Sequence, residues 1–257
     1  MPIRCFVLFF VCLAGATAQT TLYFDDFSGS GLADLHGTAP DIRPGSETWQ
    51  AGTGAAAWKA DGSASEEGNQ NAFLPFTPVA GHRYTLSVTA NPQSAADAWF
   101  ALGFSTTAAV DGFYAITLDA GPWLLLRGVR PNLSDGIQTF FGPNTAQGQS
   151  HGADSGFLYL SVVLDTTAAD WEVTWRAGDT ILRQQAYVGG NPDINYVALG
   201  KYGNLSVSIS DFSLTQSAAV PEPANVALVI GLLAGATILV ARRRHSQSLK
   251  PADQSGT

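Results

Sequence analysis

Between residues 19 and 216, short runs in which apolar and polar residues alternate are separated by clusters of glycine, asparagine, aspartate and proline. Alternation with a period of two is typical of strands that bury one face, and the clusters are typical of turns. No segment before residue 224 shows the apolar spacing of an amphipathic helix. Parallel strands would need such helices as crossover connections. The pattern therefore predicts an all-β fold, an antiparallel sandwich or barrel.

The clearest alternation lies in three segments, 84–90, 171–176 and 206–214. In each of them every second residue is large and apolar, which predicts strands with one buried face. In the third segment the alternation shifts by one residue near Asp211, and this shift predicts a β-bulge. Weaker patterns predict further strands at 98–104, 113–118, 123–127, 157–164, 180–185 and 195–202.

Both ends of this region resemble a known architecture. The opening Phe24-Asp-Asp-Phe27, followed by Trp49, is similar to the first strands of laminin-G-like and concanavalin A-like jelly-roll domains. The closing Ile-Ser-Asp-Phe-Ser-Leu at 209–214 is similar to their last strand. The resemblance implies a jelly-roll β-sandwich over residues 19–216, with the last strand beside the first. Such folds host lectins, glycosidases and adhesive domains, so the fold alone selects no function.

The first 18 residues are predicted to be a secretory signal peptide. Arg4 is basic, residues 5–14 are apolar, and Ala16 and Ala18 form a small-x-small cleavage site. Both cysteines of the chain lie inside this segment. The mature protein is therefore expected to have no disulfide and no thiolate nucleophile.

The chain after residue 216 combines three features of a membrane anchor. An extended linker is expected at 217–223, because proline fixes φ and removes backbone donors. Residues 224–241, roughly 18 in number and without charge, are close to the ~20 that span a bilayer as a helix. The basic tail 242–257 begins with an arginine cluster that predicts the cytoplasmic side. These arginines are Arg242, Arg243 and Arg244.

The order of these features resembles the PEP-CTERM sorting signal of exported proteins in Gram-negative bacteria. Its motif corresponds to Pro221, Glu222 and Pro223, directly before the apolar run. The resemblance implies recognition and cleavage by an exosortase, an integral-membrane sorting enzyme. The protein would then lie in the inner membrane with its sandwich outside the cytoplasm, and later at the cell surface or in the extracellular matrix. A simple single-span anchor is the alternative.

The predicted mature domain is strongly acidic. The whole chain has a formal net charge of −8, and residues 19–219 carry 8 Lys and Arg against 19 Asp and Glu, which gives 8 − 19 = −11. A domain with this charge repels phosphate backbones, so we expect no binding to nucleic acids.

Motifs of catalysis are missing from the sequence, and we predict no enzyme and no catalytic residue. The Glu-x-Asp-x-x-Glu run of jelly-roll glycosidases does not occur, and the adjacent pairs Asp25-Asp26 and Glu66-Glu67 would point to opposite faces of a strand.

Cofactors are not expected, with one exception, a structural calcium ion. If the first and last strands pair, Asp25 or Asp26 would approach Asp211 and offer a structural calcium site; ordinary surface acids are the alternative.

Six tryptophans are candidates either for the core or for stacking on sugar rings. Trp171 and Trp175 alternate with Val173 and are predicted to be in the core, whereas Trp49 and Trp123 follow glycine-rich segments and are candidate glycan contacts. The hypothesis is a non-catalytic surface or matrix protein that binds exopolysaccharide. The alternatives are a glycoside-active enzyme of the jelly-roll type and a purely structural surface protein.

Overall fold

The computed structural model describes residues 19–31, 33–64, 68–92, 99–110, 119–127, 136–143, 145–149, 156–203 and 206–218. The chain divides into two units, and all of these residues belong to the unit Ala16–Ala219. The predicted signal peptide with Ala16 and Ala18, the Pro-Glu-Pro motif, the apolar run 224–241 and the arginine cluster all lie outside the described residues. Among the residues that are described, no helix is long and apolar enough to cross a bilayer.

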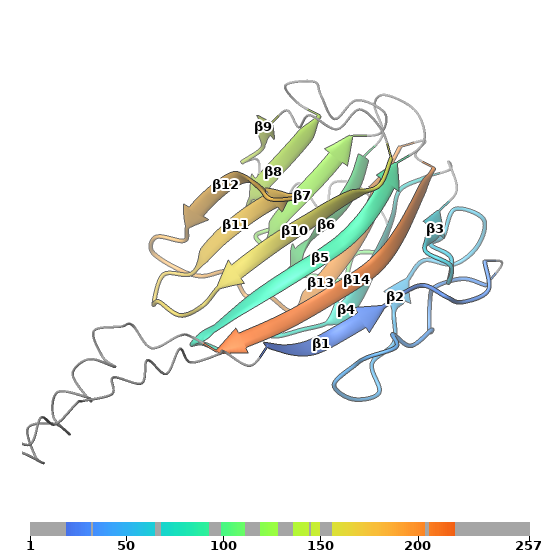
Figure 1. Ribbon diagram of the computed structural model, residues 1–257, viewed down its shortest axis with the longest axis horizontal. Coiled ribbons are helices and arrows are strands. Elements are labelled where there is room, and N and C mark those ends of the chain that lie inside the picture. Colours follow the sequence, from blue (N-terminus) through green and yellow to red (C-terminus); the bar gives the residue numbers. More distant parts are fainter. Residues whose placement is uncertain are drawn as a thin grey trace, which may run out of the picture. The chain divides into compact units, whose positions relative to one another are not determined.

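The described residues form two seven-stranded antiparallel sheets (Figure 1). Sheet 1 has the order β1-β14-β5-β10-β11-β12, and β3 also pairs with β14. Its strands are β1 (Gln19–Asp25), β14 (Val207–Ala218), β5 (His82–Pro92), β10 (Leu158–Asp165), β11 (Glu172–Ala177), β12 (Thr180–Ala186) and β3 (Ser63–Ala64). The predicted all-β antiparallel sandwich is therefore confirmed.

Sheet 2 has the order β2-β4-β13-β6-β7-β8-β9. Its strands are β2 (Gln50–Ala51), β4 (Gln70–Pro75), β13 (Tyr196–Tyr202), β6 (Trp99–Ser105), β7 (Pro122–Arg127), β8 (Ile137–Phe141) and β9 (Gln147–Gln149). The sequence patterns predicted β6, β7 and β13, but they missed β2, β4, β8 and β9, as well as β3 of sheet 1. The predicted strand at 113–118 lies outside the described residues.

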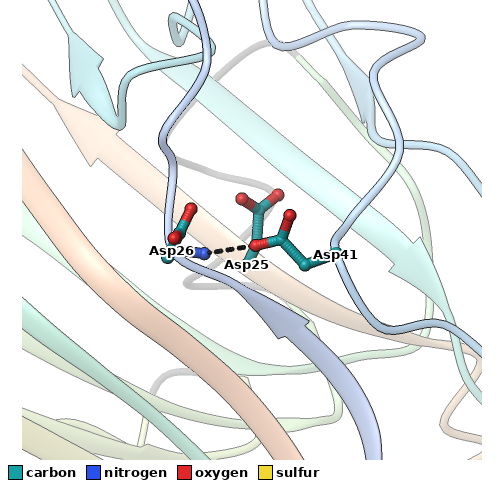
Figure 2. Close-up of side chains that lie close together, drawn as sticks. All are labelled: Asp25, Asp26 and Asp41. Carbon is teal, nitrogen blue, oxygen red and sulfur yellow. Dashed lines mark hydrogen bonds between the residues drawn. The ribbon is translucent and has the colours of Figure 1, made fainter.

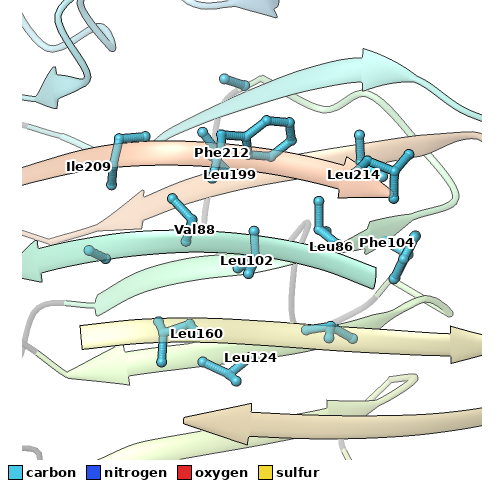
Figure 3. Packing of buried hydrophobic residues seen from close by; sticks show 14 of the residues in the cluster. Leu86, Val88, Leu102, Phe104, Leu124, Leu160, Leu199, Ile209, Phe212 and Leu214 are labelled. Atoms are coloured by element: carbon cyan, nitrogen blue, oxygen red, sulfur yellow. The ribbon is translucent and has the colours of Figure 1, made fainter. Parts of the chain in front are cut away.

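The main core lies between the two sheets and follows the alternation of the strands (Figure 3). On β5, Leu86 and Val88 are fully buried, and Leu160 on β10 and Leu102 on β6 pack in the same cluster. Every second residue of these strands faces this layer because successive side chains of a strand point to opposite faces. The outward residues of sheet 1 are thereby left free to form a surface.

The pairing of β1 with β14 confirms that the last described strand lies beside the first (Figure 1). The predicted bulge is confirmed too, since the register of β14 against β5 shifts between Ser210 and Ser213. Asp211, inside this shift, has a positive φ of 55°. The extra residue explains why Ile209 and Phe212, three positions apart, both face the core.

Sheet 2 also carries apolar side chains on its outer face, where they form a second, smaller cluster. Its aromatic members are Phe73, Trp99, Trp123 and Phe140. The ring of Trp123 lies so close to Gly103 on the neighbouring strand that a Cβ at that position would approach it to 2.5 Å. Ala108 and Val110 pack against the same cluster. Strands of sheet 2 are thus buried on both faces.

Candidate functional site

Both tryptophans predicted as glycan contacts are buried, so that prediction was wrong. Trp49 is 0 % exposed and Trp123 is 1 % exposed. The Nε1–H of Trp49 donates to Oδ2 of Asp25 at 2.7 Å, and its ring meets Phe212 edge to face at 4.9 Å. Large rings bury more area than any other side chain, and this favoured the core over the surface. Trp175 is buried in the core as predicted.

Three aspartates, Asp25, Asp26 and Asp41, come together where β1 ends (Figure 2). Their nearest carboxylate oxygens all lie within 4.8 Å of one another. The predicted third acid, Asp211, is not in this group, and its carboxylate instead accepts a hydrogen bond from Ser210 Oγ at 2.8 Å. The bulge places Asp211 on the exposed side of β14, whereas Asp41 reaches the cluster because its neighbour Ile42 pairs with Phe24.

Hydrogen bonds hold the cluster in place. Asp25 accepts from Phe27 N at 2.9 Å as well as from Trp49, and Asp41 accepts from Asp26 N at 3.0 Å. Burial is the main reason why the pKa of Asp25 lies above its usual value, and the nearby charges of Asp41 and Asp26 add to the effect. Carboxylate oxygens suit a hard cation. The donor set of Asp25, Asp26 and Asp41 therefore fits calcium, and calcium binding stays a prediction.

A second feature lies on the outer face of sheet 1, where β5, β10, β11 and β12 form a shallow depression of about 490 Å³. We call it the polar groove, and its lining includes Arg83, Tyr159, Asp165, Glu172, Arg176 and Gln184. From Tyr159 to Asp165 it follows six residue steps of β10, which at ~3.3 Å per residue is about 20 Å. This length accommodates an oligosaccharide rather than a single ring.

One end of the polar groove is built from a charged row across three strands. Arg83 on β5 is opposite Asp165 on β10, and Asp165 is opposite Glu172 on β11. Arg83 donates to Asp165 through Nη2 at 2.6 Å and Nε at 3.0 Å. Gln184 donates to Glu172 at 2.7 Å. Each side chain is oriented by a neighbour and still borders the groove.

The carboxylate of Asp165 is fully engaged. One oxygen accepts from Arg83, and the other accepts from the backbone N and the hydroxyl of Thr167, at 3.0 and 2.6 Å. Partial burial opposes ionisation, but these hydrogen bonds outweigh it and hold the pKa of Asp165 below its usual value. Asp165 is therefore ionised at neutral pH and cannot serve as a proton donor there.

The other end of the polar groove offers an apolar surface beside a cation. Tyr159 is 46 % exposed and Ile181 is 49 % exposed, and both line the groove. Arg176 is opposite Ser161 on one side and Ile181 on the other. Asp179 follows in the turn between β11 and β12. An exposed tyrosine ring next to charged groups is suited to stacking on the apolar face of a sugar.

Glu172, Thr174 and Arg176 are the polar residues of the alternation predicted at 171–176, and in the structure they line the groove. Sequence reasoning did not identify the groove. The signal for each strand was present, but only the pairing order shows that the outward faces of four strands, far apart in sequence, lie together. Sequence reasoning also missed Asp41, which is in a segment without strand alternation.

No protein-family model and no curated protein matches this chain. Among solved structures, it is similar to an endo-1,3-beta-glucanase from Streptomyces sioyaensis, at 12 % identity and a TM-score of 0.46, over 79 % of this chain and 97 % of that one. A protein of unknown function with a galectin-like fold from Bacillus subtilis has 10 % identity and a TM-score of 0.48, over 79 % and 100 % of the chains. The VIP36 exoplasmic/lumenal domain, in a Ca2+/Man3GlcNAc-bound form, has 13 % identity and a TM-score of 0.45, over 68 % and 87 %. These values are low, and no function is assigned from them.

Proposed function

We propose that the sandwich binds a polysaccharide in the polar groove without hydrolysing it. The observation that carries the proposal is the groove itself, a depression of about 490 Å³ that combines hydrogen-bonding side chains with the exposed ring of Tyr159. Glycan sites need both parts, because a sugar ring presents hydroxyl groups at its edge and C–H groups on its faces. A purely structural surface protein would have no need of such a groove.

Glycoside hydrolysis is the second candidate, and the pairing of Asp165 with Glu172 is the observation that favours it. Side chains directly opposite on antiparallel strands have Cβ atoms about 4.5–5.5 Å apart, close to the spacing of carboxyl groups in retaining glycosidases. Hydrolysis also needs one carboxylate free to attack and one carboxyl group that donates a proton. Since Asp165 is engaged by Arg83 and Thr167, binding without catalysis is the better supported function.

Replacing Tyr159 by alanine is expected to weaken glycan binding about five- to thirtyfold, because stacking on an aromatic ring contributes on the order of 1–2 kcal/mol. Titration calorimetry against a panel of soluble polysaccharides measures the effect. Phe157→Ala is the matched control, since Phe157 is 61 % exposed and is not part of the groove lining. It should leave the affinity unchanged.

Two results would count against binding without hydrolysis in this groove. Equal losses in Tyr159→Ala and Phe157→Ala would show that the contact is made elsewhere or is non-specific. Release of reducing ends from the bound glycan, abolished by Glu172→Gln, would show that the protein is a glycosidase whose acid is Glu172.

We further propose that the chain is exported, anchored by residues 224–241, and sorted to the cell surface or matrix of a Gram-negative bacterium by an exosortase-type enzyme. The support is the sequence alone: the N-terminal signal pattern, Pro221-Glu222-Pro223, the apolar run and the arginine cluster. In this proposal the exosortase-type enzyme cleaves the chain, and the polar groove binds its glycan after the sandwich has been released from the membrane.

Replacing Glu222 by alanine in the native host tests the sorting proposal. The wild type should lose its C-terminal segment and leave the membrane fraction, and the variant should stay there uncut, as cell fractionation and intact-mass measurement would show. If the wild type keeps its C-terminus and both forms remain in the membrane equally, the segment is a simple anchor.

A further inference from the structure

The charges of the polar groove restrict the kind of polysaccharide it takes. Resting on the proposed glycan binding, we infer that the ligand is an uncharged polysaccharide, rather than a polyuronate or a polymer of amino sugars. Five charged side chains are distributed along the groove. These side chains are Arg83, Asp165, Glu172, Arg176 and Asp179.

Each end of the groove carries both signs of charge. Arg83 is paired with Asp165 at 2.6 Å, and Glu172 is directly opposite Asp165 on the next strand. At the other end Arg176, on β11, is followed by Asp179 in the turn after that strand. A polymer with one sign of charge on every repeat would therefore meet a like charge at both ends. Like charges brought together on binding cost free energy that attraction elsewhere in the groove has to offset.

Hydroxyl groups have no such conflict. Each hydroxyl both donates and accepts hydrogen bonds, so it can bind a carboxylate and a guanidinium alike, and hydrogen bonds to charged groups are stronger than neutral ones. The amide of Gln184 and the hydroxyls of Thr85 and Thr174 add uncharged partners in the middle of the groove. The alternating charges then serve as strong acceptors and donors for a neutral chain.

The electrostatic field of the whole domain also disfavours the binding of polyanions. Residues 19–219 have a formal charge of −11, from 8 Lys and Arg against 19 Asp and Glu. This field repels an anionic polymer at low ionic strength and is screened by salt. A polycation would be attracted at long range, but in the groove it would meet Arg176 and the exposed guanidinium of Arg83.

The test compares four polymers on the purified full-length protein in detergent: laminarin and dextran as neutral glucans, alginate as a polyuronate, and chitosan as a polycation. Titration calorimetry at low and at high ionic strength measures each affinity. At least one neutral glucan should bind with an affinity that changes less than about twofold with salt, and alginate should bind at least about tenfold more weakly at low salt. Glu172→Gln should weaken the neutral glucan about fivefold. Asp193→Asn, which removes the same charge from an exposed residue outside the groove lining, should not.

The outcomes separate this inference from the proposed function. Tighter binding of alginate or chitosan than of either glucan, with an affinity that falls as salt is added, would overturn the inference and leave glycan binding in place. No binding of any polymer by a wild-type protein with a native circular-dichroism spectrum would overturn both. Equal effects of Glu172→Gln and Asp193→Asn would also overturn the inference, because the charges in the groove would then matter no more than the overall charge.

Discussion

Gly62→Ala is expected to lower the free energy of unfolding by about 3 kcal/mol, because alanine at this position is disfavoured twice. Gly62 has a positive φ of 73°, which costs a residue with a Cβ about 1–2 kcal/mol. The added Cβ would also lie 2.5 Å from the carbonyl oxygen of Ile209, and relief of such overpacking costs about 1–3 kcal/mol. Urea denaturation of the purified protein measures the change.

Gly37→Ala separates the two contributions. Gly37 has nearly the same φ, 78°, but a Cβ there would meet nothing within 4 Å. Its cost should therefore be about 1 kcal/mol, from the backbone conformation alone. Equal destabilisation by the two substitutions would contradict the close approach between Gly62 and β14, which is also where Ile209 N donates to Gly62 O at 3.0 Å.

Trp49→Phe is the second substitution with a large expected effect, a loss of about 3 kcal/mol of stability at neutral pH. It keeps an aromatic ring beside Phe212 but removes the N–H that donates to Asp25. Oδ2 of the buried Asp25 carboxylate then lacks a partner, while Oδ1 still accepts from Phe27 N. An unpaired buried acceptor costs about 1–3 kcal/mol, and the smaller ring leaves a cavity. Glycan affinity should not change, since Trp49 is not part of the polar groove.

The effect of Trp49→Phe should depend on pH. Burial already raises the pKa of Asp25 in the folded protein, and loss of the Trp49 hydrogen bond raises it further. A group with a raised folded pKa destabilises the fold as pH rises from its unfolded pKa to its folded one. The variant should therefore lose less stability at pH 4 than at pH 7, as denaturation at the two pH values would show.

Trp175→Phe is the control for this pH dependence. Trp175 is also fully buried, but among the described residues its Nε1 has no hydrogen-bond partner. Its replacement should cost stability to the same extent at both pH values. A pH dependence shared by both variants would exclude the Trp49–Asp25 hydrogen bond as its cause.

The clearest alternation in the sequence, on β5, β11 and β14, belongs to strands that bury one face. On β5 and β11 the alternation is visible because the outward side of sheet 1 is polar. Strands covered on both faces lack this alternation: β6, β7 and β13 gave only weaker patterns, and β4, with four consecutive buried residues, was missed. The second apolar cluster on sheet 2 thus explains both the missed strand and the burial of Trp123.

The two candidate sites differ in how far the sequence could predict them. Pairing of the first and last strands was foreseen, but it does not bring Asp211 into a group with Asp25 and Asp26 as predicted, and the third acid of the cluster is Asp41. Asp211 has a positive φ inside the bulge and points outward. Alternation in the sequence does not predict this backbone conformation. The polar groove depends on the neighbours β5, β10, β11 and β12, and strand order is not encoded in any single segment.

The position of β14 has a consequence for how the protein is made. This strand comes last in the described chain, yet it lies between β1 and β5 and has backbone partners on both sides (Figure 1). Contacts this distant in sequence form slowly, and β1 has no other strand partner in sheet 1. A nascent chain that lacks residues 207–218 therefore cannot complete the sheet. Closure of sheet 1 therefore has to wait until residues 207–218 have been synthesised, long after β1.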